Sequence, residues 1–183
     1  MESLIAKLEE ISLRPVARTD YEAKGYHLDV LVEPARVVDA AEIMNAAAYT
    51  LEAVTGVDWL GEESRRIEAE VKARNAAAAK AAKEAEEEPP EPEVADLSQV
   101  KEELEVVYDY THFGHLFRVM VRCRIPRETP ELPSIHQIFP GADWHEKETH
   151  DFFGIVFTGN PDLSPFLLPE DADYHPLLKD FSA

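Results

Sequence analysis

The sequence has one cysteine, seven glycines and only 18 lysines and arginines among its 183 residues. The single cysteine, Cys123, can form no disulfide within the chain and cannot supply the several thiolates that hold an iron–sulfur cluster. A glycine-rich phosphate loop and a serine nucleophile flanked by glycines are also absent from the sequence. If the protein takes part in electron transfer, we therefore expect other chains to hold the cofactors.

Basic residues are also few relative to the acidic ones, since 37 aspartates and glutamates give a formal net charge of −19. Such a charge repels phosphates, so nucleic acids and anionic membrane surfaces are poor direct partners. No apolar run approaches the roughly 20 residues needed to cross a bilayer, and the first ten residues, MESLIAKLEE, lack the apolar stretch of a signal peptide. We expect a cytoplasmic protein made of one domain, or of one domain with an appendage.

The spacing of apolar residues in the first third predicts two helices and two strands. A helix over residues 3–12, capped by Ser3, precedes a strand over residues 26–33, where the period changes to two. A second helix over residues 34–49 begins with a proline. Residues 51–60 form another short strand, which a glycine, Gly56, is expected to interrupt. The expected inner faces consist of Leu4, Ile5, Leu8 and Ile11, then Tyr26, Leu28, Val30 and Val32, and then Val37, Val38, Ala41, Met44 and Ala48.

The composition changes in the middle of the chain. Between residues 62 and 88, Ile67 and Val71 are the only large apolar residues among many alanines and charged residues. Residues 84–96 then contain seven acids and three prolines. We interpret residues 62–100 as a solvated insertion, a helix followed by an acidic, proline-stiffened linker. A tolerated surface insertion is the simpler interpretation, and a docking role is the alternative.

Two alternating runs around Gly114 predict a β-hairpin over residues 104–125. Cys123 falls on the apolar face of the second run, which favours a packing role over a reactive thiol. Arginines 118, 122 and 124 fall on the other face, which is either exposed or turned toward an acidic partner. Interspersed helices and strands with a hairpin indicate an α+β fold with a small mixed or antiparallel sheet and flanking helices.

The C-terminal part is irregular apart from a short helix that begins at Pro140. The last 30 residues contain several prolines but also many large apolar residues. Such a segment does not float in water, so it must lie on its own domain or on another protein. The expected division of the chain is an N-terminal part of the α+β domain (residues 1–61), the insertion (62–100), the hairpin and helix that complete the domain (101–154), and an extended partner-docking tail (155–183).

The stretch HEKETHDFFG, residues 145–154, allows several interpretations. His145 and His150 are five residues apart and diverge by about 140° on a helix, so a zinc-dependent hydrolase remains only a remote alternative. The three carboxylates of Glu146, Glu148 and Asp151 have the residue type for acid–base chemistry. We favour a mechanical role for them, in which they fix a rigid corner that ends at a left-handed glycine, residue 154.

The same residues carry a family resemblance. Residues 146–163, EKETHDFFGIVFTGNPDL, resemble the signature of the C-type, 30 kDa subunit of complex I, the NADH:quinone oxidoreductase of the respiratory chain. The ending LLPEDADYHPLLKDF and the lead-in LPSIHQIFPGADWHEKE also resemble that family, and the resemblance covers nearly the whole chain apart from residues 62–100. The family-signature and interface residues that it implies are Glu146, Glu148, Asp151, Phe153, Gly154, Phe157, Pro161, Asp162, Leu163, Pro169, His175 and Pro176.

The resemblance implies a cofactor-free structural subunit of the peripheral arm of a complex I-like enzyme, which supports electron transport and ion pumping without catalysis of its own. The implied partners are the large D-type subunit beside the quinone site and neighbouring iron–sulfur subunits, in a hetero-oligomer that is peripheral to the inner (cell) membrane. Iron–sulfur clusters, and a flavin or a nickel–iron centre, would belong to those partners. The tail would wrap over the large subunit and become ordered on binding.

The chain departs from the family pattern mainly at basic positions. Lys147 replaces an arginine, Asn160 replaces a histidine, Ser164 and Pro165 replace two arginines, and Leu178 replaces another basic residue. Membrane-bound, energy-converting nickel–iron hydrogenases contain a homologous small subunit, so that branch is the main alternative. A free-standing adaptor that uses the acidic insertion is a third possibility.

Overall fold

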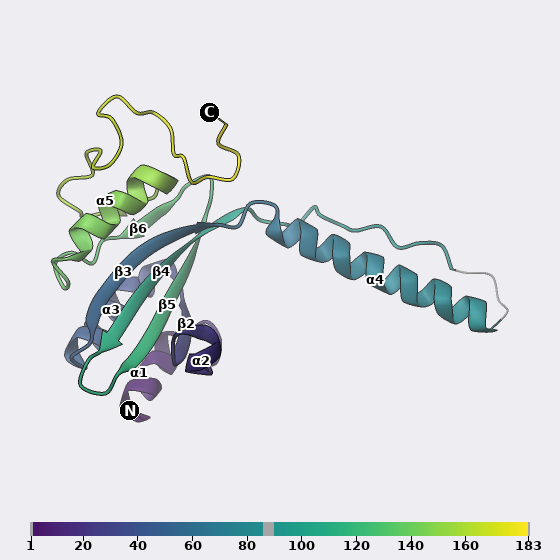
Figure 1. Cartoon of the computed structure of the whole chain (residues 1–183), viewed down its shortest axis with the longest axis horizontal. Coiled ribbons are helices and arrows are strands. Elements are labelled where there is room, and N and C mark those ends of the chain that lie inside the picture. The colour runs from purple at the N-terminus through teal and green to yellow at the C-terminus, as the bar shows by residue number, and fades with distance from the viewer. Residues whose placement is uncertain (1, 86–89, 183) are drawn as a thin grey trace. The chain divides into compact units, whose positions relative to one another are not determined.

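The structure is a computed structural model that describes residues 2–85 and 90–182 (Figure 1). The chain forms two compact units, Met1–Asp58 with Glu103–Ala183, and Trp59–Glu102. The first unit has the predicted α+β fold, a mixed five-stranded sheet flanked by helices. Among the described residues, no helix is both long enough and apolar enough to cross a membrane.

The sheet of the first unit is built around one long hairpin. Its strands, in the spatial order β1-β2-β5-β4-β3, are β1 (Ala17–Arg18), β2 (Leu28–Val32), β5 (Phe117–Pro126), β4 (Glu103–His112) and β3 (Thr50–Asp58). Strands β2 and β5 are parallel, and the other neighbours are antiparallel. The register aligns Val30, Val121, Tyr108 and Val54 in one row across four strands, and all four are buried. One face of the sheet is therefore apolar and forms one side of the hydrophobic core.

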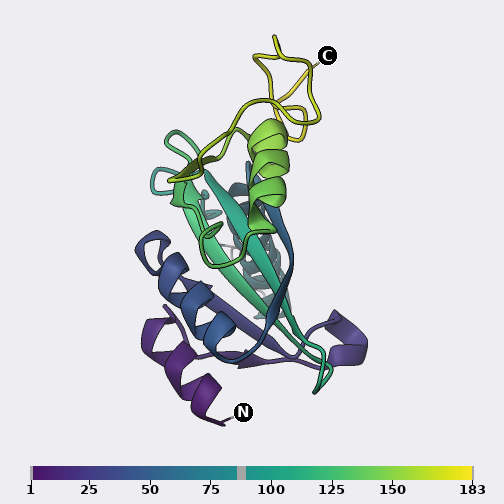
Figure 2. The same cartoon turned by 90° about the vertical axis from the view of Figure 1, so that its left-hand side faces the viewer.

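Three helices cover this apolar face. Figure 2 shows α1 (Glu2–Ile11), α3 (Val37–Ala46) and α5 (Ala142–Phe153) in front of the sheet, and each contributes buried side chains to the same core. A short helix, α2 (Tyr21–Lys24), and a 3₁₀ turn, η1 (Pro34–Arg36), complete the N-terminal part. Cys123 is buried in this core as predicted, and burial raises the pKa of its thiol to about 12.

The predicted inner faces are largely confirmed, with corrections at the element ends. Tyr26 precedes β2 and lies against Arg122 on the outer face, not in the core. Ser3 lies inside α1, which already begins at Glu2, so it is not a cap. Ala48 is exposed beyond the end of α3 with φ of 60°, and Ala40 is buried in the helix instead. Helix α3 is shorter than its pattern indicates at both ends, because Pro34 starts a 3₁₀ turn that delays its start to Val37 and because it ends at Ala46.

Gly56 does not interrupt its strand, contrary to prediction. It lies inside β3, where a Cβ atom would come within 2.5 Å of the Phe153 ring. The glycine therefore lets α5 pack closely on β3, which is a role in packing rather than in a turn.

The outer face of the sheet carries the arginine row, and the chain neutralises it with its own acids. Arg118 pairs with Asp109 in two parallel contacts, and Arg122 bridges Asp29 at 3.0 Å and Glu105 at 3.0 Å. The three carboxylates are buried. These cross-strand pairs hold neighbouring strands together, so the row does not depend on an acidic partner for its counter-charges.

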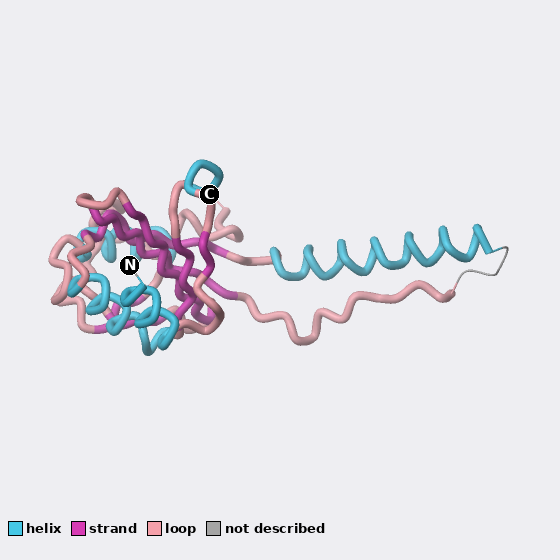
Figure 3. The backbone as a smooth tube through the Cα atoms, turned by 90° about the horizontal axis from the view of Figure 1, so that it is seen from below, coloured by secondary structure: helices cyan, strands magenta, loops and turns pink. Residues whose placement is uncertain are grey.

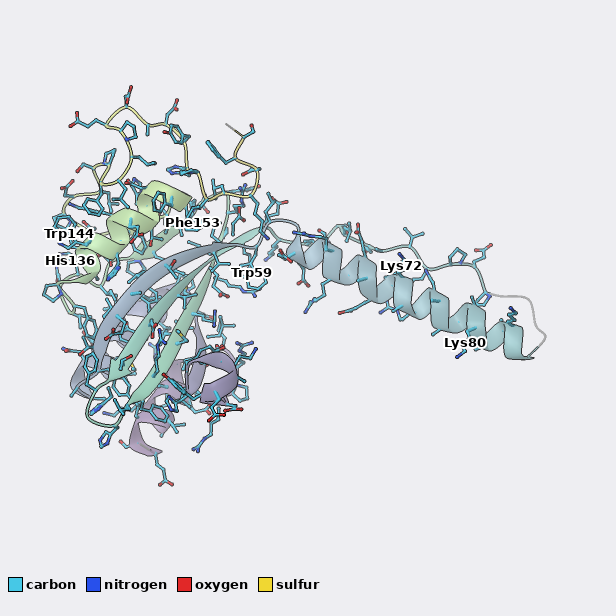
Figure 4. The ribbon with its side chains drawn as sticks, viewed as in Figure 1. Trp59, Lys72, Lys80, His136, Trp144 and Phe153 are labelled. Atoms are coloured by element: carbon cyan, nitrogen blue, oxygen red, sulfur yellow. The ribbon has the colours of Figure 1, made fainter. Side chains whose placement is uncertain are left out.

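The second unit is the predicted charged helix with a return segment. Helix α4 (Glu62–Ala85) carries few buried side chains, and Figure 3 shows the irregular segment that follows the undescribed residues running back beside it. Arg74 makes a two-pronged ion pair with Glu93, with both contacts at 3.0 Å. Asn75 adds two hydrogen bonds to the backbone of Glu93, at 2.8 and 2.9 Å. Lys72 and Lys80 are labelled on this helix in Figure 4.

Candidate docking site at helix α5 and the C-terminal segment

Helix α5 ends in the predicted left-handed glycine. Gly154 has φ of 72°, and its N–H donates to the carbonyl of His150 at 2.8 Å. The chain then enters β7 (Val156–Thr158), which pairs in parallel with β6 (Glu131–Pro133). These two three-residue strands were not predicted, because runs this short show no periodicity.

Glu146 is fully buried and joins α5 to the segments before and after it. Its carboxylate accepts hydrogen bonds from the Ser134 hydroxyl at 2.5 Å, the Ile135 N–H at 2.9 Å and the Asn160 side-chain amide at 2.8 Å. Asn160 stands where the resembled family has histidine, and its amide supplies a donor at this position. Buried charge is tolerated here because donors from three residues surround it.

Asp151 holds the backbone of the C-terminal segment. One of its oxygens, Oδ2, accepts from three consecutive N–H groups, those of Phe166 at 2.9 Å, Leu167 at 2.6 Å and Leu168 at 3.2 Å. Burial favours the neutral carboxyl, but these N–H donors outweigh it and lower the pKa of Asp151. The charged form is therefore the one that the fold stabilises.

His175 and Gly154 make the next attachment. A Cβ atom on Gly154 would lie 2.7 Å from the His175 ring, so the glycine leaves room for the imidazole. The His175 Nδ1 lies 2.8 Å from the carbonyl of Asp151, and the Leu177 N–H donates to the carbonyl of Phe152 at 3.1 Å. The C-terminal segment thus contacts the last turn of α5 at two further points.

A further attachment, which sequence reasoning missed, involves Asp58 at the end of β3. Its carboxylate accepts from the N–H of Lys179 at 2.8 Å. Arg127 reaches Asp58 at 3.3 Å and Asp180 at 2.5 Å. Asp58 lies 121 positions before Lys179 in the chain, and no local pattern signals a contact over that separation.

The other predicted signature residues lie in three kinds of place. Phe153 and Phe157 are buried in the core of this unit, so their side chains are not exposed to a partner. Glu148 is exposed, and no hydrogen bond or ion pair joins it to another described residue, so it does not fix the corner. Pro161, Asp162 and Pro169 are exposed, whereas Leu163 and Pro176 are half-buried.

Lys147, which stands where the resembled family has arginine, keeps an ion pair in this region. Its ammonium lies 2.8 Å from Asp162, and Lys147 together with Ser164 lowers the pKa of Asp162. Both Asp162 and Ser164 belong to the exposed start of the C-terminal segment, so the pair adds little stability.

Large apolar side chains point away from this framework. Trp144, labelled near one end of α5 in Figure 4, meets Phe166 edge-on with ring centroids 4.7 Å apart, and Leu167 beside it is 53% exposed. We call the whole set the apolar exterior, and it consists of Trp144, Phe166, Leu167, Tyr174, Leu177 and Phe181, all exposed. The segment thus lies on its own domain through its backbone and through Leu163 and Leu178, which pack against the core, while the side chains of the apolar exterior face outward.

The histidines do not assemble into a metal site. The Nδ1 of His150 lies 3.0 Å from the carbonyl of Ile155, and the rings of His112 and His115 stack at 4.4 Å. In the part of the chain that the structure describes, no three His, Cys, Asp or Glu side chains are grouped so that they could hold a metal ion. The geometry offers no support for the hydrolase alternative.

Comparison with known proteins places this arrangement in a family. Residues 30–183 match the family described as the respiratory-chain NADH dehydrogenase 30 Kd subunit. The chain belongs to this family. The resemblance seen in the sequence is thereby confirmed.

Individual relatives agree with this assignment. The chain is 33% identical over 157 residues to the corresponding NADH-quinone oxidoreductase subunit of Roseiflexus castenholzii, covering 84% of this chain and 68% of that protein. It is 46% identical over 79 residues to the subunit of the same name from Mycolicibacterium paratuberculosis, covering 43% of this chain but only 34% of that protein.

The fold also resembles that of a chain in the structure of the membrane-bound sulfane sulfur reductase, an archaeal respiratory membrane complex. The TM-score is 0.65 over 99% of this chain and 85% of that chain, with 20% sequence identity. At this identity the likeness shows that the fold is shared.

Proposed function

We propose that this member of the 30 kDa subunit family is a structural subunit of the peripheral arm of a complex I-like NADH:quinone oxidoreductase. In this proposal it holds no cofactor and packs through its C-terminal region on the large subunit beside the quinone site. Iron–sulfur clusters and flavin belong to the partner subunits, and the assembly is peripheral to the inner (cell) membrane on the cytoplasmic side. The observation that supports this most directly is the apolar exterior on a segment whose backbone is already fixed.

The apolar exterior is costly to leave in water. Full burial of a side chain such as leucine or phenylalanine contributes about 1.5–3 kcal/mol, and aromatic residues are typical anchors of protein interfaces. Glu170, Asp171 and Asp173, between Leu167 and Tyr174, are exposed acids. A partner surface that is apolar at its centre and basic at its rim fits this combination.

Substitution of Leu167 tests the docking role. Leu167→Asp removes an exposed apolar contact and places a charge there without disturbing the core, so we expect at least a tenfold loss of assembled complex on co-expression with the other subunits. Val94→Asp is the matched control, because Val94 is 85% exposed in the second unit. Assembly of the Leu167→Asp chain at the yield of the Val94→Asp chain would contradict the proposal.

The hydrogenase branch is the second candidate, because the replaced basic residues depart from the pattern of the quinone-reducing family. Ser164 and Pro165 are exposed, and Leu178 packs against the core of its own unit, so none of the three supplies a charge to a partner. The large subunit that co-purifies with the chain decides between the branches. Pairs of cysteines that bind nickel in that subunit would assign the chain to a hydrogenase, and their absence would support quinone reduction.

A further inference from the structure

The signature residues of α5 turn toward their own chain, and this separates them from the apolar exterior. We infer that Glu146, Asp151 and Gly154 form an internal clamp that fixes the C-terminal segment on its own domain and thereby sets the outward display of the docking side chains. In this inference the signature acids act on the chain itself and do not contact the partner. The link to docking rests on the proposed function, whereas the clamp itself does not.

The first step of the clamp fixes where the segment begins. Glu146 is fully buried and contacts both residues 134–135 and Asn160. Its two carboxylate oxygens accept three hydrogen bonds, and no exposed surface remains for a partner. A buried carboxylate with this set of donors positions the chain on either side of α5.

The second step fixes the orientation of the segment. The N–H groups of residues 166–168 all donate to Asp151 Oδ2, and such converging amides form a small anion-binding concavity. With the backbone turned inward at these three residues, the side chains of Phe166 and Leu167 point outward and are 42% and 53% exposed. Asp151 itself is 3% exposed, which leaves it out of reach of another protein.

The later attachments continue the same arrangement toward the C-terminus. His175 occupies the space above Gly154, the Leu177 N–H donates to the end of α5, and Lys179 is held by Asp58. The side chains of Tyr174, Leu177 and Phe181, at or next to these points, remain exposed. These attachments use the backbone or polar side chains of the segment, and Leu163 and Leu178 pack against the core. The side chains of the apolar exterior stay exposed.

The clamp changes the expected mode of binding. The family resemblance implies a tail that becomes ordered on binding, which removes backbone conformational entropy for each residue that is fixed. A segment that is clamped beforehand has already lost this conformational entropy during folding. Preorganisation of this kind favours tight association. The docking surface is therefore formed before the partner arrives.

Hydrogen exchange on the full isolated chain tests the clamp. Asp151→Ala removes the acceptor of three N–H groups, so we expect the amides of residues 166–168 to exchange at least tenfold faster than in the parent chain. Glu148→Ala is the control, since it removes an exposed carboxylate from the same helix. Amides of β4 and β5 report whether the domain is folded. Where Asp151→Ala also loses that protection, Asp151→Asn, which keeps the size, decides instead.

The outcomes separate the clamp from the docking proposal. Unchanged exchange at residues 166–168 in both Asp151 variants would overturn the clamp, whatever the result for Leu167→Asp. If the amides exchange faster but the Asp151 variant assembles normally, the claim that the clamp positions the docking side chains would be overturned. If the Asp151 variant shows faster exchange and impaired assembly but Leu167→Asp assembles normally, the clamp would be supported. The proposed docking role of the apolar exterior would then be rejected.

Discussion

At the scale of single residues, neighbouring positions of this chain do opposite things. Asp151 and Glu146 are buried and each accepts three hydrogen bonds, whereas Trp144 and Leu167 are exposed. Glu148 shows that matching the family pattern does not by itself place a residue in the clamp. The roles follow from burial and from hydrogen-bond partners, which the sequence alone does not display.

Gly154 combines a backbone requirement with a packing requirement, and a substitution separates the two. Gly25 is a suitable control, because it also ends a helix in the left-handed region, with φ of 77°, but a Cβ there would meet nothing within 4 Å. The strain of an alanine in this region is about 1–2 kcal/mol. We expect Gly154→Ala to lower the free energy of unfolding in urea by clearly more than Gly25→Ala, because His175 must also move. Equal losses would contradict the contact between Gly154 and His175.

The charge of Asp151 predicts a pH dependence of the C-terminal segment. Burial acts to raise its pKa, but the backbone donors lower it. Because the folded pKa lies below an unfolded value of about 3.9, the contribution is fully present above that value and is lost as the pH falls through the folded pKa. After correction for intrinsic rates, residues 166–168 should lose protection in that acidic range before β4 and β5 do. The Asp151→Ala chain should lack this step, and the same acid step in both chains would refute the prediction.

At the scale of elements, the insertion joins two paired strands. Asp58 at the end of β3 is opposite Leu104 near the start of β4, so the second unit occupies the place of a hairpin loop. Long insertions at such a place cost little loop entropy. The fold of the sheet therefore does not require residues 62–100.

Deletion of the insertion separates the scaffold from the adaptor alternative. We expect a chain in which a short Gly/Ser linker replaces residues 62–100 to fold, with a free energy of unfolding within about 1 kcal/mol of the parent, and to enter the complex at normal yield. Circular dichroism and co-purification measure the two properties. A folded but unassembled variant would favour the adaptor, because the acidic insertion would then carry the binding.

The elements also show how far the sequence could lead. The two-residue period of the hairpin and the helical stripes of α1 and α3 predicted the core, because burial on one face imposes these periods. Strands β6 and β7 are too short for a period. In the sequence Gly56 looks like a break in the strand. The residue that explains it, Phe153, packs against it but is distant along the chain. The same limit applies to the clamp. Local capping signals predicted the corner at Gly154, but they did not predict the attachments at Asp58 and His175, which are distant along the chain.

At the scale of the whole molecule, the larger unit has an interior and an exterior with different roles. The sheet, its helices and the clamp make a framework within the chain itself, and the apolar exterior is the part that we propose a partner covers. The family assignment rests on residues 30–183. The docking role rests on the exposed side chains, which makes it directly measurable.

Hydroxyl-radical footprinting of the chain, alone and in its assembled complex, tests the docking role of the apolar exterior most directly. We expect Trp144, Phe166, Leu167 and Leu177 to react readily in the isolated chain and to become protected in the complex, while Val94 stays reactive in both. Side chains of the apolar exterior that stay as reactive in the complex as in the isolated chain would contradict this role.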